Sequence, residues 1–291
     1  MTALEVDDVV VEYKVPGRPS VRAVSGVTLD VAAGEVLGLV GESGCGKSSL
    51  GRAIVGLNPL AAGEVRVDGR AIAPLGRRAR PRADRAVQMV FQDPYSSLNP
   101  RRRIGRQLQD AIAARSGAAA RVGELLEAVG LPAAAAARFP HQFSGGQRQR
   151  IAIARALASE PRVIVADEPV SALDASTRLQ VAGLLSETAS ARGAALLMIS
   201  HDLSGLRVIA DRIAVMYFGR IVEVGPTDQL WERPQHPYTR ALIGAIPRLG
   251  RDAPMPAEPE RRERVEVAES EARLVPCGPG HFVAAEALVE A

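Results

Sequence analysis

Long hydrophobic segments and paired cysteines are both missing from the sequence. No apolar run reaches the roughly 18 residues that a membrane-spanning helix needs, so we expect no transmembrane segment. The start, MTALEVDDVV, lacks the basic and apolar parts of a signal peptide, so we expect the chain to stay in the cytoplasm. The two cysteines, Cys45 and Cys277, have no paired spacing, which argues against a disulfide framework and a cysteine-rich metal site.

A large excess of one charge is missing as well. The 291 residues carry a net charge of +3, and 47% of them are apolar, which suffices for one large domain and an appendage. Arginines gather between Arg77 and Arg85 and again at Arg101 to Arg103. Such runs are usually solvated loop faces, but contact with another subunit or with phosphates stays open.

The apolar segments predict a mixed α/β fold. LEVDDVVVEY and VRAVSGVTLDV alternate like half-buried strands, so we expect a small antiparallel sheet near the N-terminus. Helical patterns separate the later apolar segments, as a doubly wound parallel sheet requires; these segments are EVLGLV, AVQMVF, RVIVAD, AALLMIS and RIAVMYF. A largely helical insert lies between AVQMVF and RVIVAD. Residues 248–273 are rich in proline and charge, so we expect them to be flexible.

A glycine-rich loop carries the strongest functional signal. The segment GESGCGKSS, residues 41–49, matches G-x-x-x-x-G-K-[ST] between an apolar strand and a helical pattern. Its glycines let backbone N–H groups and the helix N-terminus meet phosphate charge. Lys47 should reach the β- and γ-phosphates of ATP, and Ser48 should be a ligand of Mg²⁺. The expected nucleotide contacts are Gly41, Glu42, Ser43, Gly44, Cys45, Gly46, Lys47, Ser48 and Ser49.

Two carboxylates follow the strand RVIVAD directly. Asp167 and Glu168 should lie at the carboxyl edge of the sheet, where open α/β folds bind ligands. Asp167 is suited to holding Mg²⁺ through its water shell, whereas Glu168 can act as general base on the attacking water. A strand that merely ends in acidic residues is the alternative interpretation.

Cys45 lies inside the glycine-rich loop. The neighbouring helix N-terminus and Lys47 predict a stabilised, reactive thiolate. We therefore expect that thiol reagents modify Cys45 and block ATP binding.

Further motifs give the sequence a family resemblance. FSGGQRQRIAIARAL, which starts at Phe143, resembles the ABC signature LSGGQ and its helix, with phenylalanine in place of the usual leucine. Gln92 is similar to the Q-loop glutamine, SALD at residues 171–174 to the D-loop, and His201 to the switch histidine. The motifs occur in family order over residues 1 to about 235, so the chain resembles an ABC transporter ATPase.

This resemblance implies a fold and a domain plan. The fold would be a P-loop NTPase (RecA-like) core with an N-terminal antiparallel β subdomain and a helical signature subdomain. Residues 1–235 would form the ATPase domain, with the helical subdomain at about 95–160. Residues 236–291 would form a C-terminal extension.

The resemblance also implies roles for individual residues. Glu168, His201 and Gln92 would be catalytic, and Gln92 would also be a metal ligand with Ser48 and Asp167. The signature would complete the ATP site of the opposite subunit through Ser144, Gly145, Gly146 and Gln147. Tyr13 matches the position where an aromatic ring stacks on adenine, with a plain sheet-core tyrosine as the alternative.

Two stretches narrow the subfamily. FQDPYSSLNPR, from Phe91, and HPYTRALIGAIP, from His236, resemble oligopeptide/dipeptide importer ATPases, a group that includes nickel-uptake ATPases. Some members ligate an iron–sulfur centre with a cysteine cluster in the tail, but this tail has only Cys277, so we expect no iron–sulfur cluster in this chain.

The subfamily implies a set of partners. These are two transmembrane permease subunits, a second ABC ATPase expected to be a paralogue, and an extracytoplasmic solute-binding protein. The chain would lie peripherally on the cytoplasmic face of the membrane. Peptides are the leading solute and nickel the alternative, because solute contacts lie on other subunits.

Two other classes share some of these motifs. DNA-repair and chromosome-maintenance ATPases carry the same loop and signature, but they insert long coiled coils or zinc modules. The insert between Gln92 and Ser144 is short and has neither sustained heptads nor cysteines, so we expect no nucleic-acid partner. An exporter ATPase is the other alternative, and the HPYTRAL segment argues against it.

Overall fold

The N-terminal part of the chain forms a four-stranded antiparallel sheet in the computed structural model. The structure describes residues 1–14, 16–17, 19–75, 86–93, 97–112, 118–170, 173, 175–246 and 273–288. The strands are β1 (Thr2–Tyr13), β2 (Val21–Ala32), β4 (Ala62–Val67) and β5 (Arg70–Ala71), in the order β2-β1-β4-β5. In β2, Val27, Leu29 and Val31 are buried while Thr28 and Asp30 are exposed, which confirms the predicted half-buried strand.

A second, eight-stranded sheet forms the centre of the molecule. Its order is β11-β12-β10-β9-β3-β8-β7-β6. The neighbours from β9 to β6 pair in parallel: β9 (Arg212–Tyr217), β3 (Val36–Val40), β8 (Ala195–Ser200), β7 (Val163–Asp167) and β6 (Val87–Val90). Every residue of β3 and β7 is buried, as expected for strands covered on both faces.

Two hydrophobic cores lie on opposite faces of this sheet. Side chains of β3 alternate between them: Val36 and Val40 belong to one core, Leu37 and Leu39 to the other. The first core continues into the helices, and the second into α1 (Lys47–Ile54) and the antiparallel sheet. The central sheet therefore lies between the helices packed on one of its faces and the antiparallel sheet with α1 on the other.

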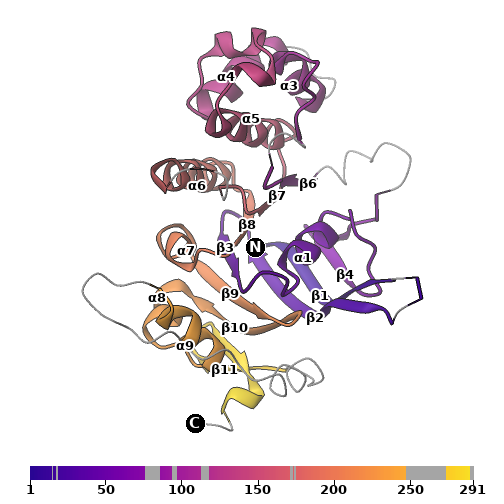
Figure 1. Cartoon of the computed structure of the whole chain (residues 1–291), viewed down its shortest axis with the longest axis vertical. Helices are drawn as coiled ribbons and strands as arrows, with labels where there is room; N and C mark the ends of the chain where they lie inside the picture. The colour runs from indigo at the N-terminus through magenta and orange to yellow at the C-terminus, as the bar shows by residue number, and fades with distance from the viewer. Residues whose placement is uncertain are drawn as a thin grey trace.

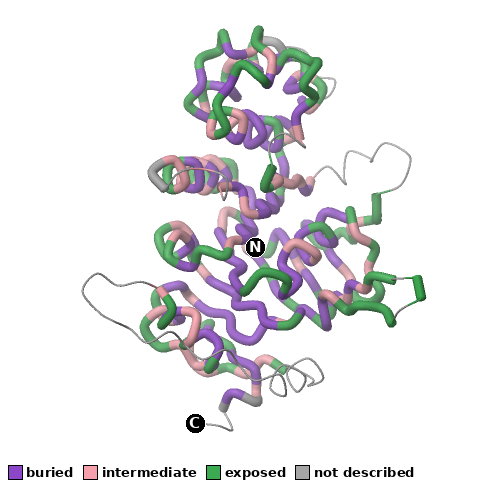
Figure 2. Tube along the Cα trace, in the orientation of Figure 1, coloured by how far each residue is buried: buried purple, intermediate pink, exposed green. Residues whose placement is uncertain are grey.

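The predicted insert between β6 and β7 forms a helical lobe, drawn at the top of Figure 1. The lobe contains α3 (Ile104–Ile112), α4 (Ala118–Ala128), α5 (Gly145–Leu157) and the short 3₁₀ helices η2 (Ala133–Ala137) and η3 (Pro140–Gln142). Figure 2 shows exposed residues over its outer surface and buried residues along the central strands. The helix α6 (Ala175–Ser190) lies between this lobe and the rest of the molecule (Figure 1).

The C-terminal part of the chain returns to the central sheet. After β10 (Arg220–Pro226) come α8 (Thr227–Glu232) and α9 (Pro237–Gly244), while α7 (Leu203–Ile209) precedes β9. The strands β11 (Leu274–Gly278) and β12 (His281–Ala284) then extend the sheet beside β10, before the short helix η4 (Ala285–Leu288). The sequence pattern did not predict these two strands. The expected flexibility of residues 248–273 falls almost wholly outside the described residues.

Among the described residues, no helix is both long and apolar enough to cross a membrane.

Candidate active site

The glycine-rich loop connects the end of β3 to the start of α1. Glycine is needed there because the loop passes very close to other backbone. A Cβ on Gly41 would lie 2.1 Å from the carbonyl oxygen of Met216, and one on Gly46 would lie 2.1 Å from that of Ala23. Gly46 also has a φ of 109°, which side chains disfavour. Glu42, Ser43 and Gly44 are exposed at the outer turn of the loop.

Lys47 is folded back onto this loop. Its side chain is buried, and its Nζ donates to the carbonyl oxygens of Gly41 at 2.6 Å and Glu42 at 2.7 Å. The ammonium group is therefore held inside the loop, where its charge faces the space that the loop encloses. This position suits a cation that must meet phosphate oxygens.

The two predicted metal ligands Ser48 and Asp167 lie in contact. The Ser48 hydroxyl donates to Asp167 Oδ1 at 2.8 Å, although the residues are 119 positions apart. Burial raises the pKa of Asp167, and the hydrogen bond from Ser48 opposes that rise. The carboxylate is thus held in surroundings that favour a cationic partner.

Glu168 is contacted by both other predicted catalytic residues. Gln92 Nε2 donates to Glu168 Oε2 at 3.2 Å, and His201 Nδ1 lies 3.3 Å from Glu168 Oε1. The Glu168 backbone has a φ of 45° and its N–H donates to Ile199, which turns the chain sharply at the end of β7. Two side chains from separate loops, Gln92 and His201, therefore meet at the Glu168 carboxylate.

The expectation of a reactive thiolate at Cys45 is wrong. Cys45 is buried, and burial raises the pKa of its thiol. Lys47, with its Nζ 3.7 Å from the sulfur, lowers the pKa, but this attraction is smaller than the cost of desolvating a thiolate. The thiol is therefore mainly neutral at pH 7.

Tyr13 lies beside the glycine-rich loop. Its side chain is 39% exposed, which excludes the alternative of a sheet-core tyrosine. Its hydroxyl donates to Ser49 Oγ at 3.0 Å and accepts from Asn58 Nδ2 at 2.8 Å. The ring is thereby fixed next to α1 with one side open to solvent.

The four signature residues form the start of α5. Ser144 is the N-cap: its Oγ accepts from the Gln147 N–H at 3.3 Å, and Gln147 Oε1 accepts from the Ser144 N–H at 3.1 Å. Gly145 and Gly146 follow in the first turn and are not buried. Figure 1 draws α5 in the helical lobe, well away from α1 and the glycine-rich loop. Of the SALD segment, the predicted D-loop, only Leu173 belongs to the described residues.

Sequence reasoning missed two contacts, one of the glycine-rich loop and one of Tyr13 beside it. The Tyr238 hydroxyl accepts from the Glu42 N–H at 2.9 Å, and Asn58 bonds Tyr13 as described above. The sequence offered a partial signal for Tyr238, because proline after a polar residue in HPYT is typical of a helix start. Contact with a loop 196 residues away has no local signal.

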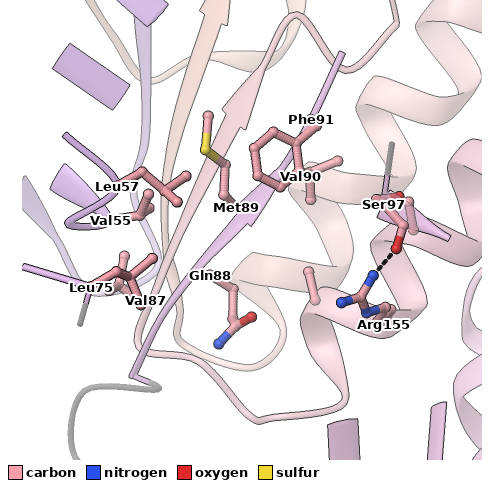
Figure 3. A pocket seen from close by; sticks show the side chains of 12 residues that line it. Val55, Leu57, Leu75, Val87, Gln88, Met89, Val90, Phe91, Ser97 and Arg155 are labelled. Carbon is pink, nitrogen blue, oxygen red and sulfur yellow. Dashed lines mark hydrogen bonds between the residues drawn. The ribbon is translucent and has the colours of Figure 1, made fainter. Parts of the chain in front are cut away.

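A groove lies between the end of α1, β6 and α5 (Figure 3). It has a volume of about 260 Å³. Leu57, Leu75 and Met89 form its apolar side, while Arg155 on α5 donates to the carbonyl oxygen of Ser97. Beyond Ser97 and Arg155 it continues into a cavity of about 980 Å³ beside α3, lined by polar residues that include Arg101 and Arg102.

Among the described residues, no cluster of three or more histidine, cysteine, aspartate or glutamate side chains could hold a metal ion. The predicted metal ligands Ser48, Gln92 and Asp167 include one carboxylate, so they could hold a cation only together with phosphate or water oxygens.

Comparisons with known proteins show which family the chain belongs to. Residues 24–171 match the model of the ABC transporter family, and residues 222–272 match that of the oligopeptide/dipeptide transporter C-terminal region. The chain is 49% identical over 245 residues to the oligopeptide transport ATP-binding protein OppF of Bacillus subtilis, covering 81% of this chain and 80% of that one. It is 44% identical over 284 residues to the glutathione import ATP-binding protein GsiA of Pectobacterium atrosepticum, covering 91% of this chain and 44% of that one.

A solved structure shares the fold. The ATP-binding cassette MJ0796, described as a dimer in a post-hydrolysis state bound to ADP and phosphate, superposes with a TM-score of 0.67 at 29% identity. The match covers 77% of this chain and 98% of that one. The predicted fold class, an ATPase core with an antiparallel β subdomain and a helical subdomain, is confirmed.

Proposed function

The chain belongs to the ABC transporter family of ATPases and carries the C-terminal region of oligopeptide/dipeptide transporters, and we propose that it drives peptide import across the cytoplasmic membrane. The match to the oligopeptide/dipeptide C-terminal region supports the peptide solute, and the observation that carries the ATPase activity is the meeting of Gln92 and His201 at Glu168, beside the contact of Ser48 with Asp167. These groups lie at the carboxyl edge of the parallel strands, next to the glycine-rich loop. The arrangement suits ATP hydrolysis coupled to a conformational change.

The proposed chemistry assigns a role to each of these residues. Lys47 exchanges the loop carbonyls for phosphate oxygens of ATP. Glu168 accepts a proton from water while the water oxygen attacks the γ-phosphorus and the bond to the bridging oxygen breaks, which releases ADP and phosphate. Gln92 and His201, both in contact with the carboxylate, hold it in position.

Three of the residues would hold a magnesium ion. Ser48 and Asp167 present oxygens 2.8 Å apart, and Gln92 would add an amide oxygen. Mg²⁺ takes such oxygens readily and keeps several waters or phosphate oxygens as further ligands. When bound, the ion neutralises charge on the phosphates.

A second ATPase subunit would complete each ATP site. Because α5 lies in the helical lobe away from α1, the start of α5 is poorly placed to reach the loop of its own chain (Figure 1). Ser144, Gly145, Gly146 and Gln147 would instead contact the ATP of a partner, expected to be a paralogue. Small residues at a helix N-terminus suit this contact because they expose N–H groups to phosphate. Tyr13 would stack on the adenine.

The groove of Figure 3 is the proposed docking site for the permease subunits. Its lining residues on β6 are close in sequence to Gln92, and others belong to the core and to α5. A permease segment seated there could therefore respond to movement of the helical lobe relative to Glu168. The chain would be held at the cytoplasmic face of the membrane through this contact, while an extracytoplasmic binding protein delivers the solute.

Reconstitution in proteoliposomes tests the solute. The chain would be combined with its cognate permeases, second ATPase and solute-binding protein, and ATP hydrolysis and uptake would be measured with a peptide mixture, with nickel ions and with DNA. We expect peptides to raise both rates and DNA to raise neither. Stimulation and uptake by nickel instead would replace peptide import with nickel import and leave the ATPase assignment intact.

A further inference from the structure

The first peptide of the glycine-rich loop is held from both sides. The Glu42 N–H donates to the Tyr238 hydroxyl at 2.9 Å, and the carbonyl oxygen of the same peptide, that of Gly41, accepts from Lys47 Nζ at 2.6 Å. One of these partners belongs to the loop itself, whereas the other belongs to α9, in the C-terminal part of the chain. A hydrogen bond at this point restricts a loop whose glycines otherwise leave it many conformations.

Tyr238 is itself rigidly placed. Its side chain is buried, and its ring packs against that of Tyr217 with the centroids 4.1 Å apart. The Tyr238 N–H donates to His236 Nδ1 at 3.1 Å, which caps the start of α9, and Pro237 occupies the first helical position. Burial raises the pKa of the Tyr238 hydroxyl far above its usual range, so the group stays neutral at physiological pH.

A buried glutamate fixes the segment before α9 to the central sheet. Glu223 on β10 is fully buried; its Oε1 accepts from the Gln235 N–H at 2.8 Å, and its Oε2 from the His236 N–H at 2.9 Å. His281 on β12 is also buried, and its Nε2 lies 2.8 Å from Glu223 Oε1. A continuous series of bonds thus runs from β12 through β10 and α9 to the glycine-rich loop.

The C-terminal end of α9 also lies near the carboxyl edge of the central sheet. Leu242, Ala245 and Ile246 line a cavity of about 370 Å³ together with Gly41, Glu42 and His201. The C-terminal part therefore contacts the loop through a hydrogen bond and faces the switch histidine across a small cavity.

From this geometry we propose that Tyr238 is a positioning residue for ATP binding, through which the C-terminal part of the chain sets the conformation of the glycine-rich loop. The proposal rests on the proposed function, because it assumes that the loop binds ATP. A pre-ordered loop loses less conformational entropy when ATP binds, so the bond should lower the dissociation constant for MgATP. It makes no contact with the reacting atoms and should leave the chemical step unchanged.

The test compares Tyr238→Phe with Tyr217→Phe in the full chain. Each variant loses one hydroxyl from a buried ring, but only Tyr238→Phe removes the bond to Glu42. One lost hydrogen bond predicts that Tyr238→Phe raises the dissociation constant and KM for MgATP about three- to tenfold, with kcat within about twofold of wild type. Tyr217→Phe should bind MgATP like wild type.

Amide hydrogen exchange separates positioning from general stability. In Tyr238→Phe, peptides covering residues 41–46 should exchange faster while those of β3 and β8 keep their wild-type protection. If Tyr238→Phe has wild-type affinity and wild-type exchange in the loop, the proposal is wrong although the ATPase function stands. Failure of the wild-type chain to bind MgATP would instead overturn the proposed function.

Discussion

The carboxyl edge of the central sheet and the start of α5 differ in where their polar groups find hydrogen-bond partners. At the sheet edge, side chains from distant segments bond one another: Ser48 contacts Asp167, and Gln92 contacts Glu168. At the start of α5, the capping bonds stay within Ser144 to Gln147. The polar groups of the sheet edge come from distant segments of one chain. The capping bonds at the start of α5 join only neighbouring residues, and its first turn is not buried. This difference supports the proposal that one chain contributes to two ATP sites, to one through its sheet edge and to the other through the start of α5.

Removing the carboxylate of Glu168 should have the largest effect. In Glu168→Gln the amide keeps the shape but cannot accept a proton from water, so hydrolysis should fall about 10²- to 10⁴-fold, or roughly 3–5 kcal/mol of barrier. MgATP affinity should change little because Lys47, Ser48 and Asp167 remain. Single-turnover hydrolysis and equilibrium binding should be measured with a partner ATPase substituted at its equivalent glutamate.

A near-normal rate in Glu168→Gln would place the base elsewhere. His201, whose Nδ1 lies 3.3 Å from Glu168, would then be the leading candidate. The groups at the sheet edge would then not be organised around the Glu168 carboxylate.

Gly145→Ala should separate the two halves of the site. An added Cβ at Gly145 meets nothing closer than Leu173 at 3.9 Å, and alanine is favoured over glycine in a helix, so the free chain should be at least as stable as wild type. The methyl group would stand between the helix N–H groups and a partner's phosphate. Losing one such charged hydrogen bond predicts that hydrolysis in the paired complex falls about ten- to a hundredfold.

Gly183→Ala on α6 is the matched control. An added Cβ there meets nothing within 4 Å, so this variant should hydrolyse ATP at the wild-type rate in the same complex. MgATP affinity of the unpaired Gly145→Ala chain should also equal wild type. A loss of affinity in the unpaired chain would show that the start of α5 serves its own loop.

Much of the sheet edge could be predicted from the sequence because each part is local. The loop at residues 41–49 and the pair Asp167 and Glu168 have short patterns, and the apolar strands that precede them predict where they meet. The segment that forms β11 and β12 has no such pattern. Both strands are short. They belong to the central sheet only because β12 pairs with β10, where Glu223 lies opposite Val283.

Other features depend on burial, which residue order does not reveal. The spacing of Cys45 and Lys47 predicts attraction between thiolate and ammonium but not the larger cost of desolvation. Likewise, the sequence gives no indication that Glu223 is fully buried beside His281. Both depend on which segments of the fold cover them.

Asp167→Asn should have a smaller effect, which weakens MgATP binding but stabilises the nucleotide-free chain. Loss of the charge should weaken MgATP binding, because the proposed metal ligand becomes neutral. The nucleotide-free chain should become more stable, because burial raises the pKa of Asp167 and the charged form therefore costs folding free energy at pH 7. We therefore expect a Tm above that of wild type for the nucleotide-free variant, measured by calorimetry.

The pH dependence of this gain checks its cause. A group whose pKa is raised in the folded state favours folding at low pH and loses that contribution as the pH rises through the folded pKa. The stability difference between Asp167→Asn and wild type should therefore shrink as the pH falls toward 3.8, the ordinary pKa of aspartate. A difference that is constant with pH would assign the gain to packing.

The smallest expected effect concerns the reactivity of the two thiols. Cys45 is buried inside the glycine-rich loop, whereas Cys277 on β11 is partly exposed, and burial raises the pKa of both. Iodoacetamide should therefore label Cys277 several-fold faster than Cys45, and both more slowly than free cysteine. Because the neutral thiol must lose its proton first, the rate at which Cys45 is labelled should still be rising at pH 9.0, the ordinary thiol pKa.

Bound MgATP should slow the labelling of Cys45 further and leave that of Cys277 unaffected, as measured by mass spectrometry of each peptide. Faster labelling of Cys45 at pH 7 would mean that the loop opens enough for Lys47 and the helix N-terminus to outweigh burial, and that this half of the site is less fully assembled than its hydrogen bonds indicate.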